Sequence, residues 1–229
     1  IEFMNLTEFV DLIIPRGGKG LIQTLVDNSK VPFILDGDGN VHLYIHEDAK
    51  KENILDIVIN SKVQRPGVCN ALETLLINSE IYQDMGSQII EELLENDVEL
   101  FVDAKIKEDY PNLNLANNLH YETEFLELKL AVKLVENDSQ AIEHIKNYSS
   151  GHTDAILTES KEIADNFAKS IDSSVIFINS STRFTDGEMF GFGSEIGIST
   201  QKLHVRGPMG LEALTNERYV VTGEGTVRK

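Results

Sequence analysis

The sequence predicts an α/β protein of three layers, in which a largely parallel sheet is covered by helices. Short apolar runs bounded by Gly, Pro or Asp alternate with amphipathic stretches along most of the chain. This alternation is typical of successive βαβ units. One amphipathic stretch shows helical spacing directly, because Ile54, Ile57, Val58 and Val63 fall on one face of a helix.

The predicted elements follow one another in chain order. Glycines open the first helix, which makes one βαβ unit with its two flanking strands. A glycine-rich loop at 37–40 separates this unit from the rest of the chain. We expect strands at 9–14, 31–35, 42–45, 73–78, 126–135, 154–157 and 174–178, and helices at 19–28, 51–62, 81–96, 139–146 and 161–171.

The C-terminal part of the sequence differs from this pattern. Residues 180–210 are rich in Gly, Ser and Thr, and a β-prone run follows at 218–222. A lone terminal strand needs a sheet to join, and pairing with a neighbouring subunit is one solution. We therefore expect a C-terminal oligomerisation strand.

Composition excludes several classes of function. The 229 residues carry 20 Lys and Arg against 38 Asp and Glu, a formal net charge of −18, which disfavours nucleic acid and anionic membranes as partners. No apolar run is long enough to span a bilayer, and the first residues lack the features of a signal peptide. We expect a cytoplasmic protein.

The single cysteine, Cys69, is either a buried small hydrophobic residue or a reactive thiol. It ends a loop at 64–68 that breaks regular structure just before a strand, which favours a presented thiol. Arg65 would favour the thiolate, and Pro66 with Gly67 would expose backbone N–H groups as oxyanion donors. Both interpretations remain open on these residues alone.

Two other groups of residues are candidates for binding: the turn at 16–18 for an anion, and the histidines for a metal. Arg16, Gly17 and Gly18 lie between a strand and a helix, where backbone N–H groups suit an anion; a tight turn is the alternative. We assign His152 no chemical role. Because the other histidines show no metal-ligand spacing with the single cysteine, we predict no metal; they are His42, His46, His120, His144 and His204.

Several long motifs resemble those of γ-glutamyl phosphate reductases. They occur in the family order and cover nearly the whole chain from about Phe9, as the C-terminal half of the family sequence. The matching stretches are 14–21, 60–76, 149–154, 179–187, 193–200 and 206–212.

The resemblance implies an aldehyde dehydrogenase fold and the NADPH-dependent reduction of L-glutamyl 5-phosphate to glutamate 5-semialdehyde, in proline synthesis. By the family pattern Cys69 is the nucleophile. Its attack on the acyl phosphate expels phosphate and leaves a thioester, which accepts hydride from NADPH.

The resemblance also implies roles for other residues. Glu124 matches the superfamily glutamate that holds the nicotinamide ribose, with a solvated acid as the alternative, and the turn at Arg16, Gly17 and Gly18 lies near the cofactor. The substrate carries an α-carboxylate and an α-amine, which an arginine with hydroxyl neighbours suits. The substrate-binding residues expected are Arg65, Asn70, Ser181, Thr182 and Arg183.

One residue distinguishes this chain from the members of the superfamily that oxidise aldehydes to free acids. Hydrolytic aldehyde dehydrogenases carry a glutamate that activates water, and the corresponding residue here is Leu35, with Asp36 beside it. A reductase needs no such base, because water would destroy the thioester. A one-residue slip in the alignment would place Asp36 there instead and leave the point open.

The resemblance divides the chain into a remnant of the dinucleotide-binding domain at 1–40, a catalytic domain at 41–185, and an oligomerisation segment and tail at 186–229. It implies a homodimer or higher oligomer, with glutamate 5-kinase as a candidate partner. The other half of the family sequence supplies most of the cofactor fold, so we expect weak or no activity from this chain alone. A general aldehyde dehydrogenase and a non-catalytic dimerisation module are the alternatives.

Overall fold

A seven-stranded parallel sheet forms the centre of the molecule, in the strand order β4-β3-β5-β2-β1-β6-β7. The computed structural model describes the backbone of residues 1–229 and every side chain except that of Lys19. Every strand pair in the sheet is parallel. The strands are β1 Val41–Ile45, β2 Leu72–Asn78, β3 Glu99–Val102, β4 Asn114–Leu115, β5 Lys129–Val135, β6 Thr153–Leu157 and β7 Val175–Ile178.

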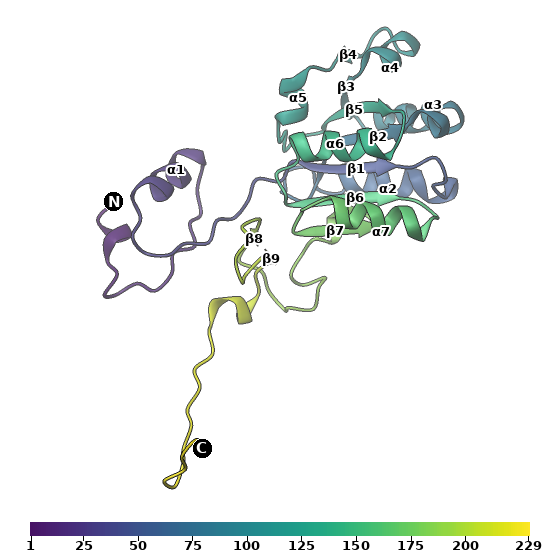
Figure 1. Ribbon diagram of the computed structural model, residues 1–229. Helices are drawn as coiled ribbons and strands as arrows, with labels where there is room; N and C mark the ends of the chain where they lie inside the picture. The colour runs from purple at the N-terminus through teal and green to yellow at the C-terminus, as the bar shows by residue number, and fades with distance from the viewer.

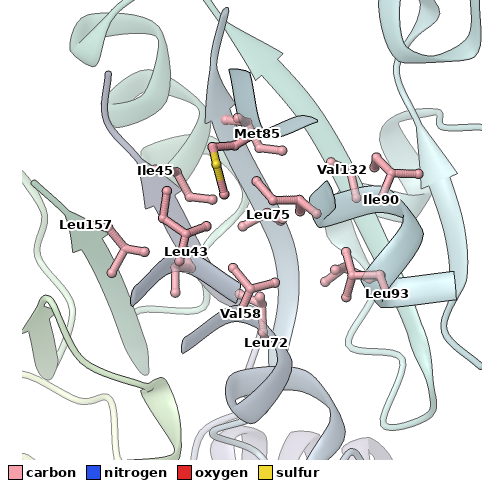
Figure 2. Close-up of a cluster of buried hydrophobic side chains, with 14 of the residues drawn as sticks. Leu43, Ile45, Val58, Leu72, Leu75, Met85, Ile90, Leu93, Val132 and Leu157 are labelled. Carbon is pink, nitrogen blue, oxygen red and sulfur yellow. The ribbon is translucent and has the colours of Figure 1, made fainter. Parts of the chain in front are cut away.

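Helices cover both faces of the sheet, because alternate side chains of each central strand point to opposite sides. Leu43 and Leu75 join a core beneath α2 Lys51–Val63 and α3 Ser79–Glu95, and Figure 2 shows this core. Tyr44 and Leu76 join a second core beneath α6 Asp138–Tyr148 and α7 Lys161–Ser170. The three-layer α/β class is therefore confirmed (Figure 1).

The predicted helices and most of the predicted strands form within a few residues of their expected bounds. The first helix, α1 Lys19–Asn28, has the expected bounds. The stretch before β5 contains elements that the sequence pattern did not predict, because each is too short for its periodicity to stand out. These are β3, β4, α4 Ala104–Asp109 and α5 Asn118–Glu122.

Two strand predictions near the N-terminus were wrong. The stretches 9–14 and 31–35 meet only in one parallel bridge, between Ile13 and Phe33, and Phe9 is 81% exposed. A strand is stable only when neighbouring strands pair with it. In the described chain, the only β-bridge of either stretch is the one that joins them to each other. They still pack with α1 around a small core that includes Leu25 and Val31.

The C-terminal part runs back from the sheet toward the N-terminal unit and then leaves the molecule (Figure 1). It contains a short antiparallel pair, β8 Ile198–Ser199 and β9 Gly207–Pro208, and Ser199 bridges to Asp36. The β-prone run near the end is extended and unpaired in this chain, with Tyr219 86% exposed. No described helix combines the length and apolar character needed to cross a bilayer.

Candidate functional site

Loops at the amino ends of the parallel strands converge around Cys69. The thiol lies on the turn between α2 and β2, and the loops that precede β1, β5 and β6 reach the same edge. Ligands of open parallel sheets usually bind at the opposite, carboxyl edge. In this chain the N-terminal unit and the 186–214 segment meet each other through the bridge between Asp36 and Ser199, and Asp36 also acts electrostatically on Cys69 at the amino edge.

The loop before β1 packs directly on the cysteine turn. A Cβ atom added at Gly39 would lie 1.6 Å from the carbonyl oxygen of Cys69, so only glycine fits there. The Gly39 N–H donates to the Glu124 carboxylate at 2.7 Å. Gly39 therefore brings together the cysteine turn and the glutamate that the resemblance assigned to the cofactor.

We expect Gly39→Ala to displace the cysteine turn. Relieving the clash requires a backbone shift, so the cost in unfolding free energy is about 1–3 kcal/mol, and a shift of about 1 Å lowers turnover by roughly 100-fold. Urea unfolding and steady-state kinetics measure both effects. Gly20→Ala is the matched control, because a Cβ at Gly20 meets nothing within 4 Å; equal behaviour of the two variants would contradict the packing argument.

Buried hydroxyl and amide groups hold the turn from the other side. Thr182 Oγ1 donates to the carbonyl of Asn70 at 2.8 Å, and Asn70 Nδ2 donates to the carbonyl of Thr185 at 2.7 Å. Ser61 Oγ donates to Ser181 Oγ at 3.2 Å. Ser181, Thr182 and Asn70 are all buried, and none lines either cavity described below. The structure thus uses them as a scaffold for Cys69, and their direct contact with a substrate stays a prediction.

A buried ion pair closes the base of the turn, and the sequence analysis missed it. Lys62 Nζ and Glu73 Oε2 are 2.8 Å apart, with both side chains fully buried. Glu73 Oε1 also accepts from the N–H of Leu126 at 3.1 Å. Burial lowers the pKa of Lys62 and raises the pKa of Glu73 to about 7. Lys62 lies in the last turn of α2 and Glu73 near the start of β2, so the pair joins the two ends of the segment that carries Cys69.

The charges around the thiol differ from those expected. Burial raises the pKa of Cys69 to about 12, and the nearby carboxylates of Asp36, Glu195 and Glu124 act in the same direction. The effect of Arg65 on the thiol stays a prediction, while burial and the three carboxylates act against the thiolate. Glu195 was not predicted as a neighbour of Cys69, although it belongs to the motif at 193–200.

Asp36, rather than Leu35, is the residue that acts on the thiol. Its carboxylate forms an ion pair with Arg16 and accepts the N–H of Ile198 at 2.9 Å. The side chain of Leu35 packs against the small N-terminal core. Each oxygen of Asp36 therefore accepts from one donor, and these contacts hold the carboxylate in place.

Neutralising Asp36 is expected to make Cys69 more reactive. Asp36→Asn removes one of the negative charges that raise the pKa of the thiol, and each unit of decrease gives about ten times more thiolate at neutral pH. Iodoacetamide alkylation followed by mass spectrometry measures the rate. Asp165→Asn, an exposed carboxylate on α7, is the control; if both variants react at the wild-type rate, Asp36 has no influence on the thiol.

Two cavities are lined by residues that act on Cys69. The first, of about 230 Å³, brings together Arg16, Gly17 and Glu124 with Asp36. Gly18 instead begins α1 as its N-cap residue and does not line this cavity. The second, of about 280 Å³, is lined in part by Arg183.

The two arginines of the predicted substrate site lie near each other. Arg65 is exposed and Arg183 is half-buried. Burial and the neighbouring Arg65 lower the pKa of Arg183, while Asp186 and Cys69 act in the opposite direction. The structure thus brings Arg65, Arg183 and Cys69 into one electrostatic neighbourhood, as the resemblance implied.

His152 lies in the scaffold beneath the site. It is fully buried, with Nδ1 2.9 Å from Thr153 Oγ1, and burial lowers its pKa to about 4. The described residues contain no group of three or more His, Cys, Asp or Glu side chains arranged to hold a metal ion.

Comparison with known proteins agrees with the resemblance seen in the sequence motifs. No family model matches the chain. A γ-glutamyl phosphate reductase from Thermoanaerobacter pseudethanolicus is 50% identical over 228 residues, a match that covers 100% of this chain and 55% of the relative. The crystal structure of γ-glutamyl phosphate reductase from Thermotoga maritima superimposes with a TM-score of 0.95 at 46% identity, over 100% of this chain and 55% of that one.

The chain is homologous to the γ-glutamyl phosphate reductases. The resemblance drawn from the motifs is confirmed, and the chain spans about half the length of these relatives. An acetylating aldehyde dehydrogenase from Geobacillus thermoglucosidasius has a TM-score of 0.74 at 18% identity, over 100% of this chain and 60% of that one. An engineered glycolyl-CoA reductase with bound NADP+ has a TM-score of 0.65 at 14% identity, over 90% of this chain and 54% of that one. The fold is thus aldehyde dehydrogenase-like.

Proposed function

We propose that this chain carries the nucleophile of a γ-glutamyl phosphate reductase, which reduces L-glutamyl 5-phosphate to L-glutamate 5-semialdehyde in proline biosynthesis. The observation that supports this most is the position of Cys69, next to wall residues of two cavities. Asp36 and Glu124 line the first cavity and act on the thiol. Arg183 lines the second and interacts with the same sulfur.

The proposed chemistry begins at the thiol, whose electrostatic neighbours line both cavities. The sulfur of Cys69 attacks the acyl carbon, a carbon–sulfur bond forms, and the carbon–oxygen bond to phosphate breaks, so that phosphate leaves with the thiol proton as hydrogen phosphate. A reduced nicotinamide cofactor, when bound, supplies the hydride that turns the thioester into a thiohemiacetal. Collapse of that adduct releases the aldehyde and returns the thiol. The loop N–H groups around Cys69 are the proposed donors to the oxyanion.

The first cavity fits one end of a nicotinamide dinucleotide. Its volume of about 230 Å³ is smaller than the roughly 300–1,000 Å³ of a typical whole-ligand pocket. The Arg16 guanidinium and the open backbone at Gly17 suit a phosphate, and a carboxylate such as Glu124 accepts hydrogen bonds from ribose hydroxyls. We propose that these residues hold the nicotinamide end, with NADPH as the cofactor.

Leu35 favours reduction over hydrolysis. It stands where hydrolytic aldehyde dehydrogenases carry a glutamate that activates water, and its apolar side chain packs against the small N-terminal core. The neighbouring Asp36 carboxylate is held in place by Arg16 and by the N–H of Ile198. An apolar residue at this position spares a thioester on Cys69 from hydrolysis, which a reductase requires.

The reaction in reverse tests the proposal. Protein expressed from the complete reading frame is incubated with glutamate 5-semialdehyde, phosphate and NADP+, and NADPH formation is followed by absorbance. We expect turnover that requires phosphate, because phosphate must release the acyl group from Cys69. Faster oxidation of simple aliphatic aldehydes with NAD+, without any need for phosphate, would instead support a general aldehyde dehydrogenase.

The C-terminal run at 218–222 supports a proposal about assembly. It is β-prone, extended and unpaired in this chain, and an unpaired strand is a template for pairing with another chain. We propose that it pairs with a second copy, so that 186–229 is the oligomerisation segment, next to the catalytic part at 41–185 and the cofactor-side remnant at 1–40.

A further inference from the structure

The cavity beside Arg183 is lined by opposite charges that do not pair. Its volume is about 280 Å³, and its walls include Gln64 from the end of α2, with Arg183, Asp186 and Glu188 from the loop after β7. Neither Arg183 nor Asp186 forms an ion pair, within 4.0 Å, with any described side chain. Arg183 and Asp186 are close in sequence, a separation at which side chains of opposite charge can form an ion pair.

Separate contacts hold the two charged groups in place. Arg183 Nε donates to Gln64 Oε1 at 2.8 Å, which directs the guanidinium along α2. Asp186 Oδ1 accepts the backbone N–H groups of Glu188 at 2.9 Å and Met189 at 3.1 Å, which fixes the carboxylate in its own turn. Both side chains are half-buried, so each charge is only partly screened by water.

The two groups are nonetheless within electrostatic range. Asp186 acts on the pKa of Arg183 in the direction opposite to burial. A cavity with one fixed positive and one fixed negative wall is complementary to a zwitterion of small size. An α-amino acid is such a zwitterion, and its carboxylate matches the planar donors of a guanidinium.

Resting on the proposed function, we propose that this cavity binds the α-amino-acid end of the substrate, with Arg183 holding the α-carboxylate and Asp186 the α-ammonium. Arg183 was expected as an anchor, whereas Asp186 is new and determines specificity for an amino-acid substrate. The cavity exceeds the roughly 150 Å³ that holds a benzene-sized group, so it has room for these few atoms. Cys69 acts electrostatically on Arg183, which places the anchor for the α-carboxylate within electrostatic range of the thiol.

A pair of substrates that differ only in the ammonium tests this assignment. The reverse reaction is measured on the full protein with L-glutamate 5-semialdehyde and with 5-oxopentanoate, which lacks the amine. Asp186→Asn keeps an Oδ1 acceptor for the turn and removes the charge. We expect kcat/KM for the amino substrate to fall at least about tenfold, mainly through KM, while the value for 5-oxopentanoate stays within about threefold.

Glu143→Gln is the control, because Glu143 is an exposed carboxylate on α6 that does not line this cavity. It should leave the ratio between the two substrates unchanged, and thermal unfolding should show that both variants are folded. The assignment is overturned if Asp186→Asn leaves the ratio as in the wild type, or if Glu143→Gln alone removes the preference. A wild-type protein without phosphate-dependent turnover would defeat the proposed function itself, which is a separate outcome.

Discussion

Cys69→Ala is expected to abolish the phosphate-dependent reaction, lowering kcat/KM by about 10⁴-fold or more. Without the sulfur no thioester can form, so neither acyl transfer to phosphate nor reduction has an intermediate. NADPH formation from glutamate 5-semialdehyde, phosphate and NADP+ measures the loss. The turn should survive, since its hydrogen bonds involve Asn70 and Thr182 rather than the thiol.

The controls for this variant separate chemistry from folding. The urea midpoint of Cys69→Ala should lie close to that of the wild type, and Cys69→Ser should be similarly inactive, because a hydroxyl is far harder to deprotonate than a thiol. Activity of Cys69→Ala within tenfold of the wild type would show that the thiol is not the nucleophile. That result would favour a reaction without a covalent intermediate on Cys69.

Lys62→Met is expected to cost about 3–5 kcal/mol in unfolding free energy, because it leaves the Glu73 carboxylate buried without its cation. Glu73→Gln keeps an acceptor for the Leu126 N–H while removing the charge. The double variant Lys62→Met/Glu73→Gln should therefore recover much of the loss. Urea unfolding of the wild type, both single variants and the double variant gives the coupling energy; strictly additive effects would contradict a buried ion pair.

The pH dependence of Lys62→Met follows from the direction of the Glu73 shift. The folded-state pKa of Glu73 is about 7, above the ordinary value of 4.5, so its favourable contribution is fully present below the unfolded value and is lost as pH rises through the folded value. Removing Lys62, which opposes this shift, raises the folded pKa further. Lys62→Met should thus be less destabilised near about pH 5 than near about pH 8.

Local patterns were sufficient for much of the fold. The bounds of α1 and the alternation through α2, β2 and α3 follow from contacts between residues a few positions apart, which sequence periodicity records. The strands expected at 9–14 and 31–35 failed because strand formation depends on distant pairing partners. The short elements between α3 and β5 contain too few residues to show a period.

Some residues of the candidate site could be predicted from the sequence, but others could not, and neither could all of the roles. The motifs pointed to Cys69, Arg183 and Glu124, and the fold brings these three into one neighbourhood. They could not show that Thr182 is a buried support for the cysteine turn. Burial is decided by what packs on a residue, and here the packing segments are more than 100 residues apart in the sequence.

The sequence by itself determined the α/β class, the similarity to γ-glutamyl phosphate reductases and the turn that carries Cys69, because each depends on the order of residues along the chain. Only the tertiary structure decided the surroundings of the thiol. Asp36, Glu124 and Glu195 come from three distant segments to raise its pKa, and Lys62 meets Glu73 beneath it. Electrostatic interactions depend on distance in space and on the exclusion of water, and neither quantity is encoded in local periodicity.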